Sequence, residues 1–342
     1  MSQSVELDAR PHIDSPEESF VEGTVIRKST GQYWVAGEAG SALVVCSLTN
    51  MLRKQLVYPI ADPTSWRPHV LAVKEIRLVD PVAIGDRVRF LPAGPGCGQI
   101  QEVLPRRSKL SRRAAGAQPL EQVIVANADQ VVVVFAAAQP AVRWNLVDRY
   151  LVSTEACNLP ALLCFTKLDL VKEEDLLAEL EPYRHCGYRI LLTSSTQQVG
   201  IEELRQALHG KLSALVGSSG VGKTTLLNTL EPGLGQRVRE ISKITGKGRH
   251  TTSSLEMYTL TGGGFLVDSP GMREYGLWNV DPNHLASLFP EMRPYLGNCR
   301  FGVSCRHDKE PGCAVKKAME EGAIHPRRYQ SWLRLASSLR EE

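Results

Sequence analysis

Eight residues in the middle of the chain have the types and spacing of a phosphate-binding loop. Gly217 to Thr224 reads GSSGVGKT, which has the form G-x-x-x-x-G-K-T. The apolar run Leu212–Val216 precedes the loop and the helix-like run Leu226–Leu230 follows it, as such a loop requires. Backbone N–H groups at a helix N-terminus would bind nucleotide phosphates. Lys223 would reach the β- and γ-phosphates, and the Thr224 hydroxyl would bind Mg²⁺.

A second motif predicts which base the nucleotide carries. Thr166-Lys167-Leu168-Asp169 follows an apolar run and has the form [NT]-K-x-D, although this motif alone also occurs at ordinary helix starts. The Asp169 carboxylate can accept hydrogen bonds from guanine N1–H and the N2 amine, which adenine does not offer in that arrangement. The Lys167 stem can cover one face of the base. The backbone N–H groups of Ser194 and Ser195 can bind guanine O6, so we predict GTP and GDP as ligands.

Two further stretches are typical of segments that contact the γ-phosphate. Thr251 and Thr252 end a stretch rich in Gly, Lys and Arg, and one of these threonines should ligate Mg²⁺. Asp268-Ser269-Pro270-Gly271 matches D-x-x-G. Asp268 would hold Mg²⁺ through water, and the Gly271 N–H would sense the γ-phosphate. The sequence therefore predicts two switch stretches.

The second switch stretch lacks the glutamine that orients the attacking water in many GTPases, because Met272 follows Gly271. A thioether orients water poorly, so hydrolysis should be slow without another group or a partner. His250, beside the two threonines, is the candidate for that group, and Lys223 is the other catalytic residue that we expect. A histidine at this position can also be a contact to solvent or RNA.

The predicted nucleotide site gathers residues from five motifs. The residues expected to contact the nucleotide are Thr166, Lys167, Asp169, Ser194, Ser195, Gly217, Ser218, Ser219, Gly220, Val221, Gly222, Lys223, Thr224, Thr225, Thr251, Thr252, Asp268 and Gly271. The base-recognition motifs precede the phosphate loop and both switch stretches, whereas most GTPases have the reverse order. This order predicts a circularly permuted GTPase domain, which is tolerated because domain termini usually lie close together.

The pattern over residues 116–280 predicts the α/β elements that such a site requires. Strands are expected at Val131–Phe135, Ala161–Phe165, Ile190–Thr193, Leu212–Val216 and Phe265–Val267. Helices are expected at Leu146–Cys157, Glu173–Leu180 and Ile201–Leu208. This alternation indicates a mostly parallel sheet covered on both faces, with ligands at the carboxyl ends of its strands.

The N-terminal part of the chain changes from an acidic tail to a β-rich segment. Residues 1–19 are polar and include two prolines, so we expect a flexible tail. Residues 20–105 predict an OB-like β-barrel, which can bind nucleic acid or serve only as a spacer. Strands are expected at Phe20–Ile26, Gln32–Ala36, Ala42–Leu48, Val70–Val79 and Asp86–Leu91, with a long loop at 51–68.

Residues 106–115 are predicted to be a basic linker between the barrel and the GTPase domain. The run from Arg106 to Arg113 holds five positive charges and no acid. Such a run is either a solvated linker or a contact for phosphates, and its place between two domains favours contact.

Three cysteines and one histidine near the C-terminus have the spacing of a metal site. Cys299-x5-Cys305-x-His307-x5-Cys313 offers three thiolates and one imidazole, which satisfy tetrahedral Zn²⁺ with no open position. We predict one structural zinc ion, with free buried cysteines as the alternative. Residues 281–342 should form a small, mostly α-helical zinc-binding domain whose basic residues could meet RNA phosphates. Helices are expected at Ala314–Glu321 and Arg327–Leu339.

Composition indicates a globular cytoplasmic protein. The 342 residues, of which 43% are hydrophobic, are enough for about two or three domains with real cores, and the formal net charge is only +3. No run of 18 apolar residues occurs, and the N-terminus lacks the basic and apolar parts of a signal peptide. We expect a soluble cytoplasmic monomer without a membrane partner.

Nearly the whole chain resembles the bacterial ribosome small-subunit-dependent GTPases, a circularly permuted family with an OB barrel, a G domain and a zinc domain in this order. The matching pieces are GSSGVGKT, GRHTT, DSPGMREYGL and CRHDKEPGCAV. The resemblance implies GTP hydrolysis stimulated by the 30S subunit, a role in late small-subunit maturation, and contact of the barrel and zinc domain with 16S rRNA. The first cysteine interval is one residue longer than the family's usual one, and the loop at 51–68 is extra.

Two other functions stay open from the sequence. One is a nucleotide-regulated RNA-binding switch that acts on another RNA, and GTP turnover stimulated by 30S subunits would discriminate against it. The other is a GTPase that inserts zinc into another protein. Such a protein would need a labile, exposed metal, whereas the four ligands here make a closed site.

Overall fold

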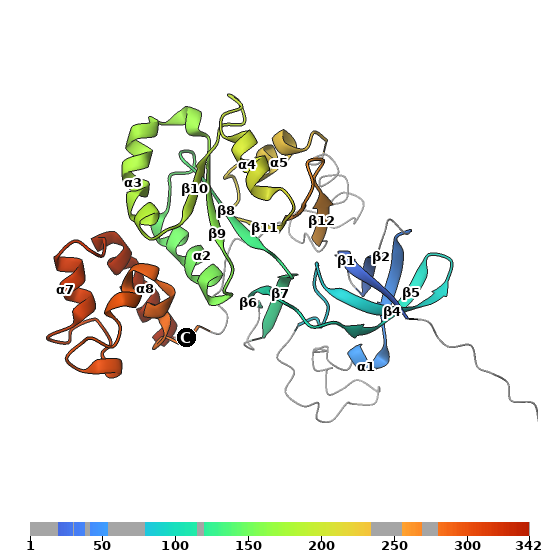
Figure 1. Cartoon of the computed structure of the whole chain (residues 1–342), viewed down its shortest axis with the longest axis horizontal. Helices are drawn as coiled ribbons and strands as arrows, with labels where there is room; N and C mark the ends of the chain where they lie inside the picture. The colour runs from blue at the N-terminus through green and yellow to red at the C-terminus, as the bar shows by residue number, and fades with distance from the viewer. Residues whose placement is uncertain are drawn as a thin grey trace, which may run out of the picture.

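The computed structural model describes residues 20–29, 31–37, 42–53, 79–114, 120–233, 255–268 and 280–341. In these ranges the chain forms a β-barrel, a central sheet covered by helices, and a small C-terminal helical unit (Figure 1). The barrel and the C-terminal unit lie on opposite sides of the central sheet in this view. The predicted tail at 1–19 and the predicted loop beyond Arg53 lie outside the described residues.

Five strands close the N-terminal barrel. They are β1 (Val21–Ser29), β2 (Gln32–Gly37), β3 (Val44–Leu48), β4 (Arg87–Gly94) and β5 (Cys97–Val103), with the short helix α1 (Asn50–Arg53) after β3. The order β1-β2-β3-β5-β4 closes because β4 also pairs with β1, and β3–β5 is its parallel pair. Val25, Tyr33 and Val35 alternate into the core, as the strand period of two requires. The predicted OB-like barrel is confirmed, and residues 70–78 of one predicted strand lie outside the described part.

Six strands form the central sheet in the order β10-β9-β8-β11-β13-β12, and every pair is parallel except β12–β13. The strands are β8 (Gln130–Ala136), β9 (Ala161–Thr166), β10 (Arg189–Leu192), β11 (Leu212–Val216), β12 (Leu255–Thr259) and β13 (Phe265–Asp268). The five predicted strands are confirmed to within one residue at each end. The sixth strand, β12, was not predicted.

Helices cover both faces of this sheet. They are α2 (Trp144–Ala156) and α3 (Glu173–His185) on one face, and α4 (Ile201–Leu208) and α5 (Lys223–Leu230) on the other. Along β8, Val131, Val133 and Phe135 share a core with α2 and α3, whereas Val132 and Val134 pack with α4 and α5. Because both faces are buried, the strand reads as an uninterrupted apolar run in the sequence.

The stretch predicted as a basic linker is structured. Lys109–Arg113 forms β6, which pairs with β7 (Glu121–Ala126) in a two-stranded sheet. Arg106 Nε lies 2.7 Å from Asp86 Oδ1, and Lys109 Nζ lies 2.6 Å from Glu121 Oε1. Residues 109–113 are therefore a paired strand, and linker is the wrong description for them. Part of the positive charge of the run is used in the ion pairs of Arg106 and Lys109.

The C-terminal unit is small and mostly helical, as predicted. It contains the short 3₁₀ helices η3 (Leu285–Leu288), η4 (Pro290–Tyr295) and η5 (Gly302–Ser304), followed by α7 (Ala314–Glu320) and α8 (Pro326–Glu341). Its core includes Phe289, Met292 and Trp332, and Val152 from α2 belongs to the same cluster. The unit therefore packs against the central sheet's helical layer.

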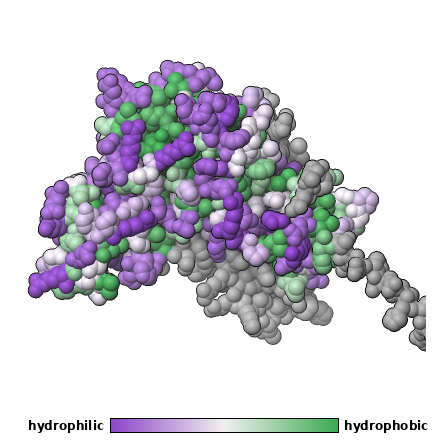
Figure 2. All heavy atoms as spheres, in the orientation of Figure 1, coloured by the Kyte–Doolittle hydropathy of each residue, from purple (hydrophilic) through white to green (hydrophobic). Residues whose placement is uncertain are grey.

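The face of the molecule in Figure 2 carries mostly hydrophilic side chains, with hydrophobic ones in smaller groups between them. Among the described residues, the buried apolar side chains gather in clusters, and the largest of these runs from the barrel into the central sheet. Among the described residues, no helix has the length and apolar character needed to cross a membrane.

Candidate nucleotide-binding site and metal centre

The phosphate loop, Gly217 to Thr224, connects the carboxyl end of β11 to the N-terminus of α5. Gly217 has a φ of 150°, and a Cβ there would lie 2.3 Å from the carbonyl oxygen of Val134. Gly222 caps α5 with a φ of 94°. Both conformations favour glycine, so the sequence spacing of these residues follows from the backbone path. Strand, loop and helix N-terminus together make a phosphate-binding geometry.

Lys223 and Asp268 are the charged centre of the site. Lys223 Nζ donates hydrogen bonds to the carbonyl oxygens of Gly217 (2.6 Å) and Ser218 (2.8 Å). Asp268 ends β13, pairs with Leu215 of β11 and is buried. Burial lowers the pKa of Lys223, and Asp268 opposes that shift. Burial likewise raises the pKa of Asp268, and Lys223 opposes it, so each charge stabilises the other.

The donor set beside the phosphate loop suits Mg²⁺. Asp268 Oδ1 is buried and makes no hydrogen bond within the described part of the chain. Thr224 is partly buried in the first turn of α5, and Thr225 next to it is exposed. Carboxylate and hydroxyl oxygens are ligands that Mg²⁺ accepts, so the residues fit this ion.

The base-recognition motif is bonded directly to the phosphate loop. Thr166 Oγ1 donates to the carbonyl oxygen of Val221 at 2.5 Å, and Lys167 Nζ donates to that of Gly220 at 3.0 Å. Lys167 has a φ of 59°, which turns the chain sharply at the end of β9. Two motifs far apart in the sequence therefore form one site.

Ser194 has a different role from the predicted one. Its hydroxyl donates to Asp169 Oδ1 at 2.5 Å, and this bond is the main reason that the pKa of Asp169 lies below its usual value. Its backbone N–H donates to the carbonyl oxygen of Val199 at 3.0 Å. The prediction that this N–H binds guanine O6 is therefore corrected: the Ser194 hydroxyl instead holds the Asp169 carboxylate. Ser195 lies next to it, in the turn that leads to Val199.

Several predicted site residues lie outside the described ranges. They are His250, Thr251, Thr252 and Gly271, together with Met272. The strands next to these residues are described: β12 begins three residues after Thr252, and β13 ends three residues before Gly271. Sequence reasoning missed β12, although its buried Met257 between partly buried Glu256 and Tyr258 follows the alternation of a strand.

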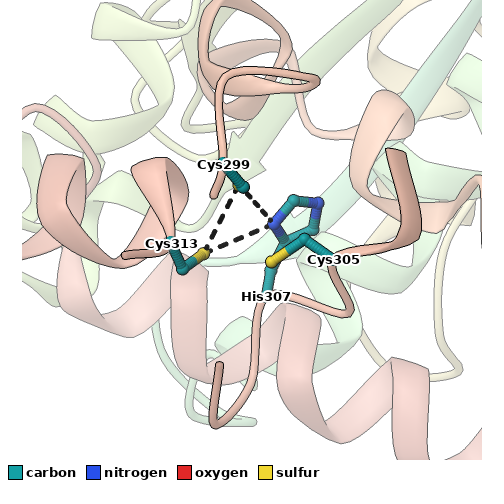
Figure 3. Close-up of side chains that lie close together, drawn as sticks. All are labelled: Cys299, Cys305, His307 and Cys313. Carbon is teal, nitrogen blue, oxygen red and sulfur yellow. Dashed lines mark hydrogen bonds between the residues drawn. The ribbon is translucent and has the colours of Figure 1, made fainter. Parts of the chain in front are cut away.

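The four predicted metal ligands converge on one point. The ligand atoms of Cys299, Cys305, His307 and Cys313 lie within 4.8 Å of one another, and all four residues are buried (Figure 3). His307 Nδ1 is 3.4 Å from the sulfur atoms of Cys299 and Cys313, which are 3.8 Å apart. Tetrahedral zinc with bonds of about 2.3 Å to sulfur would hold two thiolates about 3.8 Å apart, so the spacing fits a metal ion.

Neighbouring residues hold these ligands in place. Tyr329 OH donates to the carbonyl oxygen of His307 at 2.6 Å, and the Trp332 ring lies edge-on to the imidazole, with centroids 6.0 Å apart. The Ala314 N–H donates to Cys299 Sγ at 3.3 Å. Such outer contacts fix the orientation of metal ligands. The cluster can therefore bind one metal ion and tie the loops of the C-terminal unit together.

The chain is similar to known proteins along most of its length. A family model described as RsgA GTPase matches residues 103–278. The small ribosomal subunit biogenesis GTPase RsgA of Gemmatimonas aurantiaca is 44% identical over 260 residues, which are 75% of this chain and 84% of that protein. The protein of the same name from Azotobacter vinelandii is 45% identical over 260 residues, 75% of each chain.

Two solved structures have the same architecture. YjeQ from Thermotoga maritima matches with a TM-score of 0.71 and 29% identity, covering 95% of this chain and 100% of that one. YloQ, described as a circularly permuted GTPase, matches with a TM-score of 0.66 and 27% identity, covering 97% and 98%. These matches confirm the predicted circular permutation and the predicted combination of units. On the family model and the curated relatives together, the chain belongs to the RsgA GTPases, a family of GTP hydrolases.

Proposed function

We propose that this protein hydrolyses GTP on the small (30S) ribosomal subunit and acts late in the maturation of that subunit. The observation that carries the proposal is the similarity of the chain to curated relatives named small ribosomal subunit biogenesis GTPase. These relatives are 43% to 45% identical to it over three quarters of its length. The joined base and phosphate motifs support the GTPase part. The protein would act in the cytoplasm as a monomer, and subunit binding would stimulate its turnover.

Asp169 is the residue that selects guanine. Its carboxylate can only accept hydrogen bonds while ionised, and the Ser194 hydroxyl favours that state. It accepts from the guanine N1–H and N2 amine, while the Lys167 stem covers one face of the base. The Ser195 N–H binds guanine O6. Because Thr166 bonds the phosphate loop, base and phosphates are held by one rigid unit.

The phosphate loop and Mg²⁺ hold the triphosphate. Residues 217–225 contact the phosphates, and Lys223 neutralises the β- and γ-phosphate oxygens. Thr224 would ligate Mg²⁺ and Asp268 would hold the ion through water, and the bound ion would supply positive charge for the phosphate oxygens. The buried Asp268 oxygen without a hydrogen-bond partner in the described ranges supports this assignment.

The switch residues complete the chemistry. Thr251 or Thr252 adds a ligand to Mg²⁺, and the Gly271 N–H senses the γ-phosphate. His250 orients the attacking water in place of the glutamine that Met272 replaces. These roles are assigned from the places of the residues in the two switch motifs of the sequence.

The metal ion of the C-terminal unit is zinc, and its role is structural. Three thiolates and one imidazole suit tetrahedral Zn²⁺ and leave no open position for a substrate. The barrel and this unit contact 16S rRNA from either side of the GTPase domain. The domain limits are a tail at 1–19, a barrel at 20–105, a GTPase domain at 116–280 and a zinc-binding domain at 281–342. Residues 106–115, which include β6, lie between the barrel and the GTPase domain.

Sedimentation with isolated ribosomal subunits tests the proposed partner. The protein with a non-hydrolysable GTP analogue should pellet with 30S subunits, and it should pellet less with GDP and not with 50S subunits. Lys223→Ala, which lacks the phosphate-binding cation, should lose the difference between the two nucleotides. Equal pelleting with 30S and 50S subunits would contradict the proposed partner.

A further inference from the structure

The strand between the two switch stretches, β12, is paired along both of its edges. It pairs with β13 from Glu256↔Asp268 to Thr259↔Phe265. It also pairs with barrel strand β1 at Arg27↔Glu256 and Lys28↔Leu255. The central sheet and the barrel are therefore one continuous sheet joined through β12, and Glu256 takes part in both pairings.

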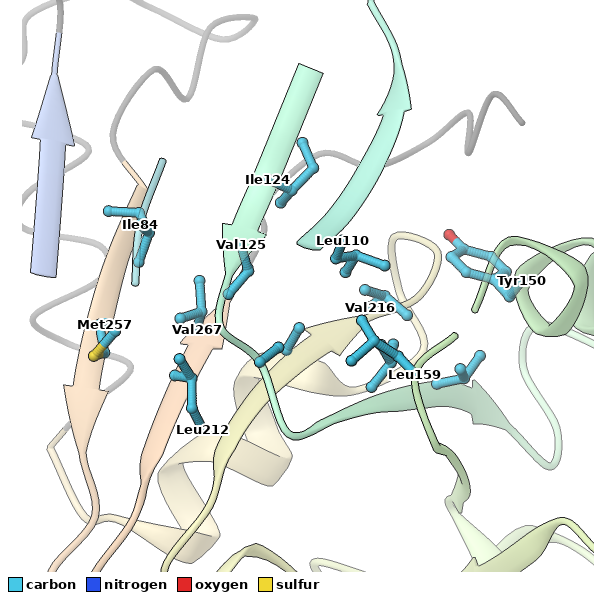
Figure 4. Close-up of a cluster of buried hydrophobic side chains, with 14 of the residues drawn as sticks. Ile84, Leu110, Ile124, Val125, Tyr150, Leu159, Leu212, Val216, Met257 and Val267 are labelled. Carbon is cyan, nitrogen blue, oxygen red and sulfur yellow. The ribbon is translucent and has the colours of Figure 1, made fainter. Parts of the chain in front are cut away.

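The two faces of β12 have different surroundings. Met257 is buried and packs in one cluster with Ile84 from the barrel side and Val267 of β13 (Figure 4). Glu256 and Tyr258 point to the opposite face, because side chains alternate along a strand. Tyr258 packs against the cluster formed by α4 and α5, so this face of β12 is on the side of the sheet that α5 covers. Glu256 lies on the side of the sheet where the phosphate loop enters α5.

Three charged residues form a row across this face. Asp268, Glu256 and Arg27 are directly opposed on three neighbouring antiparallel strands, which places successive Cβ atoms about 4.5 to 5.5 Å apart. Burial is the main reason that the pKa of Tyr258 is raised; the charges of Glu256 and Asp268 raise it further, whereas Arg27 lowers it. All three charges therefore lie close enough to the Tyr258 hydroxyl to shift its pKa, which agrees with their place on the same face as Tyr258.

The barrel end of this row is held firmly. The Arg27 guanidinium lies 4.6 Å from the centroid of the Trp34 ring, on the neighbouring strand. Lys28 Nζ bonds both Asp80 Oδ2 and the carbonyl oxygen of Val82 at 2.9 Å. The end of β1 that pairs with β12 is thus fixed within the barrel. A shift of β12 along its own axis would either break the β1–β12 pairing or move the barrel with it.

We propose that Glu256 and Arg27 are positioning residues for GTP hydrolysis: Arg27 holds Glu256, and Glu256 sets the position of the Asp268 carboxylate. The inference rests on the proposed function, which assigns Asp268 to Mg²⁺. Both switch stretches adjoin the β12–β13 pair in the sequence. A barrel docked on a partner therefore fixes β12 and, through the β12–β13 pairing, the end of β13 that carries Asp268. The barrel is then part of the catalytic unit as well as a binding module.

Charge reversal at Arg27 tests this coupling. Arg27→Glu leaves Glu256 with an acid directly opposite it on each of its two neighbouring strands. We expect the Mg²⁺ concentration for half-maximal binding of a fluorescent GTP analogue to rise by about 1.4-fold to fivefold, the range of one cross-strand pair. The kcat should fall by a similar factor, whereas the KM for GTP at saturating Mg²⁺ should not change. Arg27→Lys keeps the positive charge, so its Mg²⁺ dependence and kcat should be those of the wild-type protein.

Two further variants separate coupling from general damage to the barrel. In a Glu256→Gln background the repulsion is absent, so Arg27→Glu should have little additional effect. Arg89→Glu is the matched control, because Arg89 bonds Glu22 and Glu102 on β1 and β5, away from β12. It should leave the Mg²⁺ dependence unchanged.

The outcomes are distinguishable. Wild-type Mg²⁺ dependence in Arg27→Glu, or an equal shift in Arg89→Glu, would overturn the inference while leaving the proposed function intact. Absence of GTP turnover by the wild-type protein with 30S subunits would instead contradict the proposed function.

Discussion

The guanidinium of Arg328 in α8 donates a hydrogen bond to the Asp148 carboxylate in α2, and the two side chains are only 1% and 0% exposed. Arg328 Nε also donates to Glu291 Oε1 at 2.6 Å, and Tyr183 OH donates to Asp148 Oδ1 at 2.9 Å. One buried network of charges and hydrogen bonds therefore fixes the C-terminal unit to α2 and α3.

Arg328→Ala should strongly destabilise this contact, because it leaves two buried carboxylates without their cation. Breaking a buried ion pair by removing one partner typically costs about 3 to 5 kcal/mol. Urea unfolding should show a loss of that order, and Arg340→Ala, at an exposed position of the same helix, should change stability by less than about 0.5 kcal/mol. A decrease of less than about 1 kcal/mol in the unfolding free energy of Arg328→Ala would show that the network does not stabilise this contact.

Acid should weaken the same contact. Burial acts to raise the pKa of Glu291, but the charge and hydrogen bonds of Arg328 outweigh it and leave that pKa below its usual value. A carboxyl with a lowered folded-state pKa adds stability that is fully present above its unfolded pKa of about 4.3 and is lost as the pH falls through the folded value. Unfolding free energies measured from pH 7 to pH 3 should therefore fall below about pH 4.3, less steeply in Glu291→Gln. An equal slope in both proteins would show that Glu291 is not responsible.

Asp169→Asn should change the base that the protein prefers, because one acceptor oxygen becomes a donor. Affinity should fall for GTP and rise for xanthosine triphosphate, measured by competition with a fluorescent nucleotide. Ser194→Ala should keep the preference for guanine but weaken GTP binding about tenfold, since it removes one hydrogen bond to a charged group. GTP affinity unchanged in Asp169→Asn would refute the assignment.

Cys305→Ser should remove the metal and unfold the C-terminal unit while nucleotide binding largely persists. Zinc binding contributes roughly 10 kcal/mol or more to the folding of small zinc domains. Elemental analysis should find one zinc per wild-type chain and much less in the variant. Cys97→Ser, at an exposed cysteine of the barrel, is the control and should keep its zinc. Wild-type protein that contains no zinc when purified without chelators would rule out the site.

Features of the site that depend on neighbouring residues could be predicted from the sequence. The phosphate loop needs Gly217 and Gly222 for its backbone path, and Lys223 follows at a fixed spacing, so the local sequence specifies the local structure. The metal ligands behave in the same way, because the loop from Cys299 to Cys313 brings its own four donors together.

Features that depend on strand register or on distant burial could not be predicted. Ser194 was expected to use its N–H, but the pairing with Val199 occupies that group and leaves the hydroxyl to orient Asp169. The pairing of Arg27 with Glu256 joins residues from two separate domains, and no local pattern encodes it. In the same way, the burial of Arg328 depends on Asp148 and Glu291, which lie far from it in the sequence, so no local pattern predicts it.

His250 is the residue whose role decides how hydrolysis is stimulated. His250→Ala should keep the binding of nucleotide and subunit, but it should lose most of the stimulated rate, because a positioned base or water-orienting group typically contributes about 10² to 10⁴ in rate. Stimulated turnover should be measured beside equilibrium binding of a GTP analogue in the same variant. Wild-type turnover on saturating 30S subunits would make His250 a contact residue only.

GTP turnover by the full-length protein, alone and with isolated 30S subunits, tests the central claim most directly. Slow turnover by the protein alone, strong stimulation by 30S subunits and none by 50S subunits is the result expected for a small-subunit GTPase. Lys223→Ala should be inactive under all three conditions, which excludes a contaminating GTPase in the subunit preparation. The same rate with and without 30S subunits would contradict the account.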